Sequence, residues 1–510
     1  MTSREYPQAV PMRGSPGVRG LTVARDEWRR VVEELAGRGA RLLSLWADMD
    51  ADAGSVVRAA FFADGGVLVV SLPVSEATQP YPGIEDLYPA ASRLQRALRD
   101  VSGLASTDPD SRPWLRHASW PAGFVPLAGT AAPSASDPVA DDYAFVRVEG
   151  DGVHEVPVGP VHAGIIEPGH FRFSIVGEKV LRLEQRLGYV HKGIERRFTE
   201  LPQLEAHRLA GRVSGDSTVA YAWAYCQALE GASGLQVPAR ALWLRALALE
   251  IERIANHLGD LGMLANDAGF AFGLAQFSRL KERWLRSVAR ACGRRYLMDF
   301  VVPGGTSVDV ASPVAAELAA TAAEVEVEAR QIQAILDEHA GVRDRFFGTG
   351  IVTPELAARL GLGGLAGRAS GQAVDLRVDL PCAPYDQLAV QRAGAVTGDV
   401  AARVAVRFAE LYESCRLVQG IVLRAPQGPH QVTPRPAADG SFGLGLVEGW
   451  RGPVLVALTA GPDGTLRRCH PHDPSSLNWP VLEHAVIGNI VPDFPLINKS
   501  FNLSYSGHDL

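Results

Sequence analysis

The segments GPVHAGIIEPGHFR (residues 159–172) and GYVHKGIE (residues 188–195) decide how this chain is interpreted. Glycine and proline punctuate both segments, and these residues interrupt regular secondary structure. The first segment therefore predicts a loop between two strands, at residues 146–160 and 171–180. That loop carries His162, Glu167 and His170, whose side chains can exchange protons or form hydrogen bonds with a bound group.

The composition of the 510-residue chain is that of a folded protein, with 47% hydrophobic and 21% charged residues. A formal net charge of −7 argues against a nucleic-acid partner, because phosphate binding requires clustered Lys and Arg. Charges interrupt every long apolar stretch, so we expect no membrane-spanning helix. The N-terminus lacks the apolar segment of a signal peptide. We therefore expect a cytoplasmic protein, which can still lie against a membrane subunit.

The cysteines give no metal-binding motif. They are Cys226, Cys292, Cys382, Cys415 and Cys469, and no CxxC pair occurs. This spacing predicts neither a zinc ribbon nor a linear iron–sulfur motif. Gly304-Gly305 lacks the flanking residues of a phosphate loop, so no direct nucleotide site is expected.

Residues 1–127 are predicted to form a small α+β domain. Apolar residues from Trp28 to Leu35 recur at helical spacing, and Gly37 follows as a stop signal. Strands are predicted at residues 42–48, 56–62 and 67–72, with a hairpin turn at Asp64-Gly65-Gly66, and a second helix spans Leu87 to Leu98. Residues 128–142, AGTAAPSASDPVADD, lack bulky apolar side chains and are predicted to be a linker.

Residues 143–510 are predicted to be mainly α-helical with peripheral β elements, so the fold class is α+β. Apolar stripes at 3-4 spacing run through residues 247–261, 318–336 and 404–418, which predicts a helical bundle. Cys415 falls on the third stripe as a small core residue. Arg253, Asn256 and Asp260 lie beside the first stripe and predict a buried polar network. Residues 443–447 and 454–458 predict a terminal β element.

Ordered landmarks between residues 159 and 510 resemble a known family. They are residues 159–172, residues 188–195, Asn256-His257-Leu258, Val302-Pro303-Gly304-Gly305, residues 375–379 (DLRVD), residues 447–452 (VEGWRG) and residues 494–510. This pattern resembles the large subunits of respiratory complex I and of membrane-bound nickel–iron hydrogenases, formate hydrogenlyase in particular. Residues 100–104 (DVSGL) and the following prolines are similar to the small complex I subunit that is often fused to the large one.

The resemblance implies a nickel–iron site, yet the chain lacks its ligands. The family places two cysteines after the Arg-Val pair and two more near the C-terminus. Here the corresponding residues are Ser214, Ser217, Ser504 and Gly507. A soft metal centre needs thiolates, because sulfur donates strongly and bridges two metals. We therefore expect no metal bound by this chain and no hydrogen activation of the family's kind.

The complex I relatives imply a different chemistry, the reduction of a quinone. In them, a histidine of the early loop and a tyrosine of a later loop hold the quinone head. His162 and His170 are the candidates for the histidine in this chain. Arg212 aligns with the tyrosine position, and Tyr221 lies close by in the sequence. Quinone binding is thus permitted by the sequence, with the tyrosine pairing departing from the family pattern.

Glu167 and Arg451 match residues that flank the metal site in the hydrogenases. Glu167 matches a glutamate thought to pass protons, and the alternative is an acid that caps a helix or pairs with an arginine. Arg451 matches an arginine over the open side of the site. A guanidinium there could hold a quinone carbonyl or a carboxylate, and the alternative is a salt bridge to Glu448 or a neighbouring acid.

Two functional hypotheses follow. In the first, the chain is a subunit of a membrane-associated, complex I-like oxidoreductase complex related to NADH dehydrogenases. It would pack against an iron–sulfur small subunit and integral membrane subunits, on the inner face of the cell membrane. A cavity lined by Glu167, Arg212, Ser214, Ser217, Arg451 and Ser504 would receive a quinone-like or other small acceptor. In the second hypothesis, the chain is a catalytically inactive scaffold or coupling subunit of an ion-translocating complex.

Overall fold

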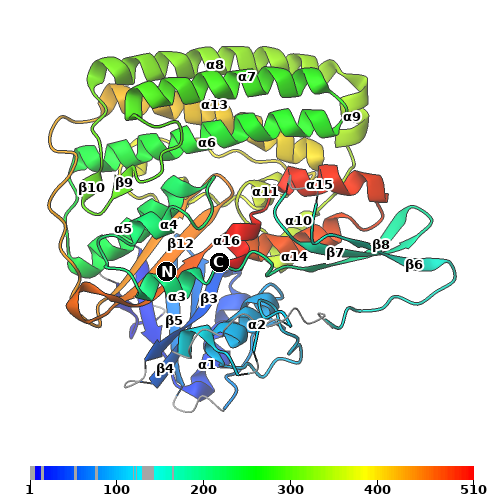
Figure 1. The fold of residues 1–510 in the computed structure, drawn as a ribbon, viewed down its shortest axis with the longest axis vertical. Coiled ribbons are helices and arrows are strands. Elements are labelled where there is room, and N and C mark those ends of the chain that lie inside the picture. Colours follow the sequence, from blue (N-terminus) through cyan, green and yellow to red (C-terminus); the bar gives the residue numbers. More distant parts are fainter. Residues whose placement is uncertain are drawn as a thin grey trace.

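The structure is a computed structural model that describes residues 6–12, 17–50, 54–74, 79–118, 120–121, 123–128, 143–162 and 166–510. Its three layers do not follow the chain order, because the middle layer contains strands that come after the helices of the bundle (Figure 1). The N-terminal part lies at one end of the molecule, a sheet covered by helix α5 lies in the middle, and a bundle of long helices lies at the other end. Most of the predicted linker, residues 129–142, lies outside the described residues.

The N-terminal part is an α+β unit. Its five-stranded sheet has the order β1-β2-β5-β4-β3. The strands are β1 (Val10–Pro11), β2 (Val18–Thr22), β3 (Arg41–Asp50), β4 (Gly54–Ala63) and β5 (Gly66–Val74), and the helices are α1 (Arg25–Gly37) and α2 (Ala91–Ser102). The predicted hairpin turn is confirmed. Asp64 and Gly65 have φ values of 49° and 69° between the paired residues Ala63 and Gly66.

A three-stranded antiparallel sheet projects from the body as an arm (Figure 1). It consists of β6 (Val153–Val158), β7 (His170–Val176) and β8 (Lys179–Arg186). The strand predicted at residues 146–160 was too long, because only residues 153–158 pair with β7. The strand predicted at residues 171–180 is divided by a turn at Gly177, whose φ of 59° favours glycine. The described residues of the predicted loop between β6 and β7 are 159–162 and 166–169, and they form neither helix nor strand.

The helical bundle contains α6 (Ala239–Asp267), α7 (Ala271–Cys292), α8 (Ser312–Glu338) and α13 (Val400–Arg424). The three predicted stripes fall on α6, α8 and α13, and their apolar residues are buried. Cys415 has no exposed surface, as its place on the stripe predicts. Helix α7 was not predicted. It packs between α6 and α8 with Phe277, Leu280 and Trp284 buried.

Helix α5 (Thr218–Ser233) lies directly on a second sheet of order β11-β12-β13. The strands are β11 (Phe442–Glu448), β12 (Pro453–Ala460) and β13 (Leu466–His472). A Cβ added at Gly443 would lie 2.0 Å from the carbonyl oxygen of Ala228, and one at Gly445 would lie 1.8 Å from that of Ala224. The helix backbone therefore approaches the strand as closely as it does because both strand residues are glycines.

The predicted terminal β element is followed by further helices. These are α14 (Ser475–Ala485), α15 (Phe494–Phe501) and α16 (Tyr505–Asp509). The remaining elements are β9 (Val301–Val302), β10 (Gly305–Thr306), α3 (Ile194–Thr199), α4 (His207–Ala210), α9 (Ala340–Phe346), α10 (Pro354–Leu360), α11 (Gly364–Ala369), α12 (Leu376–Asp379) and the 3₁₀ turns η1 (Pro126–Ala128), η2 (Tyr385–Gln387), η3 (Pro462–Gly464) and η4 (Val491–Asp493).

The N-terminal sheet packs onto the β11-β12-β13 sheet. Leu43, Trp46 and Phe62 share one apolar cluster with Leu446 and Leu455.

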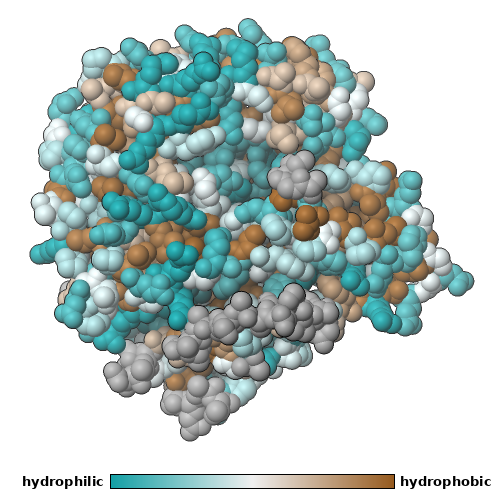
Figure 2. Space-filling model, viewed as in Figure 1, coloured by the Kyte–Doolittle hydropathy of each residue, from teal (hydrophilic) through white to brown (hydrophobic). Residues whose placement is uncertain are grey.

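Figure 2 shows apolar surface beside the β6–β8 arm, on the right of the view. Exposed apolar side chains of this region include Val161, Val176, Leu181, Ile487 and Ile490. Among the helices of the described residues, none has both the length and the apolar character that crossing a bilayer requires.

Candidate functional site

The loop before α5 meets the C-terminal segment through two serines. Ser214 Oγ donates to Asp216 Oδ1 at 2.9 Å and lies 2.9 Å from Ser504 Oγ. A hydroxyl has one proton, so Ser504 donates to Ser214. Ser504 Oγ also accepts the backbone N–H of Gly507 at 2.9 Å, as the N-cap of α16. The two hydroxyls therefore form one continuous hydrogen-bonded chain from α16 to Asp216.

Asp473 fills the space beside Gly507. A Cβ added at Gly507 would lie 2.2 Å from Asp473 Oδ2. The same carboxylate oxygen accepts the hydroxyl proton of Tyr221 at 2.7 Å, and Asp473 Oδ1 accepts the backbone N–H of Ser475. Burial and the nearby Asp473 raise the pKa of Tyr221 well above its ordinary value, so this phenol remains a hydrogen-bond donor.

Arg451, from the turn after β11, completes a group of contacts that we call the serine cluster. Its members are Ser214, Asp216, Ser217, Arg451 and Ser504. The Nη1 and Nη2 atoms of Arg451 donate to Asp216 at 2.7 and 2.5 Å, and its Nε donates to the backbone oxygen of Asn502 at 2.5 Å. Ser217 Oγ lies 3.4 Å from Arg451 Nη1. Desolvation opposes the ionised form of Asp216, but the Arg451 charge outweighs it and lowers the pKa of this carboxyl. Arg451 thus pairs with a neighbouring acid, and the acid is Asp216 rather than Glu448.

Glu167 reaches the same segment from the β6–β7 loop. Its Oε2 accepts the backbone N–H of Ser506 at 3.1 Å, and its Oε1 accepts the Ser506 hydroxyl. The side chain is exposed. In this position Glu167 acts as an acid at the start of α16, which is the capping alternative considered from the sequence.

Three of the predicted site residues make their contacts elsewhere. His162 Nε2 bonds to the backbone oxygen of Gly169 at 2.7 Å, and His170 Nδ1 bonds to that of Gly159 at 3.3 Å. Both histidines thus bond within their own loop. Arg212 donates to Asp299 at 2.6 and 2.9 Å, and its side chain is 42% exposed.

The six residues expected to line one cavity are therefore not arranged around an open space in the described structure. Ser214, Ser217, Arg451 and Ser504 contact one another or Asp216 directly, Glu167 lies at the surface, and Arg212 faces Asp299. The expectation was wrong in its geometry because it did not include Asp216, whose carboxylate draws Ser214 and Arg451 together. A cavity of about 30 Å³ does lie behind Asp216, and Glu252 and Asn256 line it.

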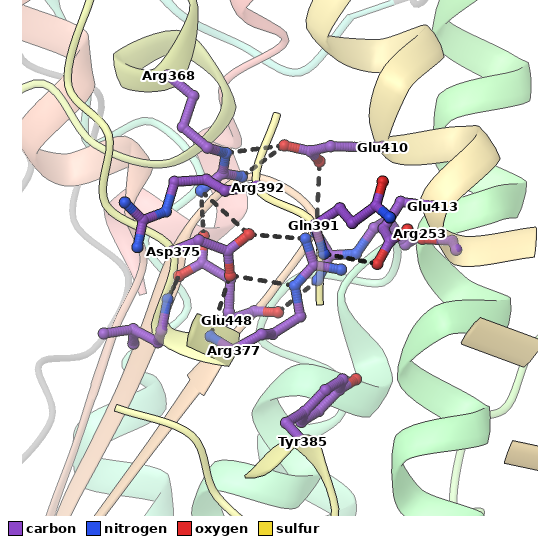
Figure 3. A network of polar contacts seen from close by, with 12 residues as sticks. Arg253, Arg368, Asp375, Arg377, Tyr385, Gln391, Arg392, Glu410, Glu413 and Glu448 are labelled. Carbon is purple, nitrogen blue, oxygen red and sulfur yellow. Dashed lines mark hydrogen bonds and ion pairs between the residues drawn. The ribbon is translucent and has the colours of Figure 1, made fainter. Parts of the chain in front are cut away.

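A buried charge network, drawn in Figure 3, is connected through Arg253 to the turn that carries Arg451. Arg253 donates to the backbone oxygens of Glu448 and Gly449, just before Arg451 in the chain. Arg368 bridges Glu410 and Glu448 at 2.7–2.8 Å, and Glu410 also accepts from His257 at 2.9 Å. The predicted network of Arg253, Asn256 and Asp260 is part of this region, but Asp260 pairs with Arg407 and Asn256 bonds backbone oxygens.

Comparison with known proteins decides the family. The chain is 31% identical over 449 residues to formate hydrogenlyase subunit 5 of Escherichia coli (strain K12). The aligned region covers 87% of this chain and 79% of that protein. The chain belongs to the large-subunit family of membrane-bound hydrogenases and respiratory complex I. A second member, hydrogenase-4 component G of the same organism, is 30% identical over 448 residues and covers 87% of this chain and 78% of that protein.

Two further comparisons agree with this family. Residues 267–439 match the family model described as respiratory-chain NADH dehydrogenase, 49 Kd subunit. A chain from the structure of the membrane-bound sulfane sulfur reductase, an archaeal respiratory membrane complex, superimposes with a TM-score of 0.66. That match has 24% identity and covers 70% of this chain and 99% of the other. It supports the fold.

The residues of this family member do not fit a nickel–iron centre. A bridging metal would need two thiolate sulfurs separated by the metal, whereas the Ser214 and Ser504 hydroxyls are in direct contact at 2.9 Å. A cysteine at position 507 would meet the Asp473 carboxylate at 2.2 Å. Among the described residues, no group of three or more His, Cys, Asp or Glu side chains is placed to hold a metal ion.

Sequence reasoning identified the serines but missed their acidic partners. Asp216 stands between the two serines of the segment RVSGDS, so its place in the sequence offered a direct signal. Asp473 lies in His472-Asp473-Pro474, far along the chain from both Tyr221 and Gly507. Only the fold brings it there, because β13 ends beneath the C-terminal segment.

The buried carboxyl group of Glu252 should make the free energy of unfolding depend on pH. Burial raises the pKa of Glu252 to about 8, against its bonds from the Val219 and Ala220 backbone N–H groups. The folded state therefore retains a proton that the unfolded state releases near the ordinary value of 4.5, so the free energy of unfolding should fall between about pH 4.5 and 8. Glu252→Gln should remove this fall, whose limiting slope is about 1.4 kcal/mol per pH unit.

The measurement is urea unfolding of both proteins across that pH range. Asp509, whose pKa burial raises to about 7, titrates with the same sign in both proteins and cancels in the difference. Glu205→Gln, which changes an exposed acid, is the matched control. A difference between wild type and Glu252→Gln that stays constant with pH would contradict the assignment.

Proposed function

We propose that this chain is a metal-free large subunit of a membrane-associated, complex I-like oxidoreductase complex, in which it couples and positions its partners. The observation that carries the proposal is the filled ligand site. Ser214 bonds directly to Ser504, and Asp473 occupies the space of a side chain at Gly507. The relatives bear the names of subunits of formate hydrogenlyase and hydrogenase-4, which supports membership in a complex of that kind.

The proposed partners are an iron–sulfur small subunit and integral membrane subunits. In this proposal the chain holds no cofactor itself, and the iron–sulfur clusters belong to the small subunit. The apolar side chains around the β6–β8 arm, which include Val161 at 80% exposure, support a contact surface there. The chain would lie on the inner face of the cell membrane through its membrane partners.

The serine cluster supports a coupling role because it links separate parts of the fold. Arg451, from the turn after β11, joins the loop before α5 through Asp216 and the C-terminal segment through Asn502. Asn502 Nδ2 in turn donates to Asp260 on α6, and Asp260 pairs with Arg407 on α13. Arg451, Asp260 and Arg407 are buried, whereas the Asp216 side chain is 39% exposed. A displacement at any of these points would have to break contacts to charged groups, so the parts are held in one arrangement.

A quinone-like acceptor is the second candidate, and one observation favours it. Glu167 is exposed where the β6–β7 loop meets α16, and His162 lies in the same loop. An acceptor held at that surface would have a carboxylate and an imidazole nearby for proton exchange. Photolabelling of the assembled complex with a quinone analogue tests this candidate. Labels confined to chains other than this one would remove it.

Metal analysis of the purified complex tests the main proposal. The chain should copurify with an iron–sulfur subunit and membrane subunits, and the complex should contain iron without stoichiometric nickel. The related formate hydrogenlyase, purified and assayed in parallel, controls for loss of nickel during preparation. One nickel ion per copy of this chain would overturn the metal-free assignment, and isolation of the chain without partners would overturn the assignment to a complex.

A further inference from the structure

A groove between helices α7 and α8 is lined by charged side chains. Both helices lie at the end of the molecule opposite the N-terminal part (Figure 1). The groove has a volume of about 640 Å³. Its lining residues are Arg279, Glu282, Arg283, Arg286, Arg290, Thr321 and Glu324. Four arginines against two glutamates make the lining positive, whereas the whole chain has a net charge of −7.

The four arginines form one row on α7. They are separated by four, three and four residues, and each residue of an α-helix is turned by about 100° from the last. Their side chains therefore project within roughly 60° of one another, along about 16 Å of the helix. The buried residues Phe277, Trp284 and Val288 lie on the opposite side of α7. The arginine row thus faces away from the core.

Helix α8 partly neutralises the first half of the row. Arg279 donates to Glu328, and Arg283 donates to Glu324 and, at 2.6 Å, to Glu328. The side chains of Arg279 and Arg283 are nevertheless 50% and 39% exposed. Each guanidinium has five N–H donors, so these contacts leave donors for a further carboxylate.

The second half of the row has more unused donors. The side chain of Arg286 is 71% exposed and donates only through Nε, to Glu282 at 2.7 Å. Glu282 is also held by Arg295, which donates to both of its carboxylate oxygens. Arg290 is exposed, and its guanidinium has no hydrogen bond or ion pair with another described residue. Like charges four residues apart destabilise a helix by about 0.2–0.5 kcal/mol, so an added negative charge stabilises this end of α7.

The shape and charge of the groove decide which kind of partner fits. Small-molecule pockets of this size are lined mainly by apolar side chains, whereas the lining residues here are polar or charged. A flat anionic surface, such as a membrane, would also meet the exposed acids Glu317 and Glu324 of α8 and be repelled. A partner as narrow as one helix meets the arginine row alone. The four-three-four spacing is also the spacing of side chains on one face of such a helix.

We propose that an acidic amphipathic helix of another chain lies along α7 and pairs its carboxylates with the four arginines. Asp or Glu residues at four-three-four spacing each meet one guanidinium, which offers two parallel donors to a carboxylate. This spacing is the same in both directions, so parallel and antiparallel helices fit equally. The inference rests on the proposed function in one respect, that the chain has protein partners in a complex.

Site-specific crosslinking in the assembled complex tests the proposal. Arg290→p-benzoylphenylalanine places a photoreactive group at the unpaired end of the row, and the same replacement at Arg30, an exposed arginine of α1, is the control. Light should join position 290, but not position 30, to a segment of another chain that carries Asp or Glu at four-three-four spacing. Crosslinks to lipid, to a segment without that spacing, or to no chain in an intact complex would overturn the proposal and leave the proposed function standing.

A peptide titration tests the same contact on the full chain without its partners. The probe is an alanine-based helical peptide with four Glu at four-three-four spacing, and the control peptide has the same composition with its Glu distributed around the helix. At low ionic strength, where surface charges are least screened, the probe should bind saturably and the control at least tenfold more weakly. Equal binding of the two peptides, or no saturable binding of the probe, would contradict the assignment even if the chain is isolated without partners.

Charge reversal connects the peptide binding to the row. The double variant Arg286→Glu/Arg290→Glu should weaken binding of the probe at least tenfold, because two attractions become repulsions. Arg30→Glu is the matched control, since the Arg30 side chain is 67% exposed and, like Arg286, pairs with an acid of its own helix. It should leave the affinity unchanged. Equal effects of the double variant and the control would show that the probe binds elsewhere, and the peptide pair on the wild-type chain remains decisive if a variant fails to fold.

Discussion

Glu410→Gln should lower the free energy of unfolding by about 3–5 kcal/mol, the usual cost of removing one partner from a buried ion pair. Glu410 is 1% exposed and accepts from Arg368 and His257, with Arg253 at 3.6 Å. Burial alone would raise its carboxyl pKa, but the Arg368 charge and the His257 bond hold the pKa well below its ordinary value. The neutral amide would remove one of the negative charges that compensate Arg368 and Arg253, so part of the buried arginine charge would be left uncompensated.

Urea unfolding at neutral pH measures this loss. Glu200→Gln is the control, because Glu200 is 65% exposed and 3.9 Å from Arg196 in a surface pair, where such a change has no measurable effect. A loss in Glu410→Gln as small as in the control would show that the network in Figure 3 is not held by this carboxylate.

Gly507→Ala should lower the free energy of unfolding by about 3 kcal/mol, through crowding and the loss of a buried hydrogen bond. The new Cβ would lie 2.2 Å from Asp473 Oδ2, so the carboxylate must move. That movement breaks its bond to Tyr221, whose phenol is fully buried. The same conflict is expected for Gly507→Cys, which would restore the family's ligand residue.

A double-mutant cycle isolates this contact. Asp473→Ala also loses the Tyr221 bond, but combined with Gly507→Ala it makes room for the new methyl group. The double variant should therefore be more stable than the sum of the two single losses by more than about 1 kcal/mol. Gly215→Ala is the control, because no atom lies within 4 Å of a Cβ added there. Additive losses would mean that Asp473 does not occupy the ligand space.

The long helices could be predicted because their apolar stripes are regular. The stripes of α6, α8 and α13 are buried as expected. Helix α7 carries four arginines, Lys281 and Glu282, and these charges obscure the pattern of its buried residues Phe277, Leu280 and Trp284. Strand β13, LRRCHPH, has a polar sequence, although six of its seven residues are buried. Arg468 of this strand pairs with Glu195, and the His470 ring stacks on Trp46.

The site could be predicted only in part, and the reason is physical. Ser214 and Ser504 were expected to line one cavity, and the structure instead brings them into direct hydrogen-bond contact. The position of Arg212 could not be inferred, because its direction depends on Asp299 in a distant segment. The polar filling of the cluster also depends on long-range packing, since Asp473 reaches Tyr221 and Gly507 only after β13 and α16 are in place.

The glycine contacts between α5 and β11 have a mechanical consequence. Side chains between two elements can change rotamer and let the elements slide, but Gly443 and Gly445 place backbone directly against the Ala228 and Ala224 carbonyls. Helix α5 and the β11-β12-β13 sheet should therefore move together as one rigid body. Because α5 begins at Thr218, directly after Ser217, and the N-terminal sheet packs on β11 and β12, a displacement of that sheet would be transmitted to the serine cluster.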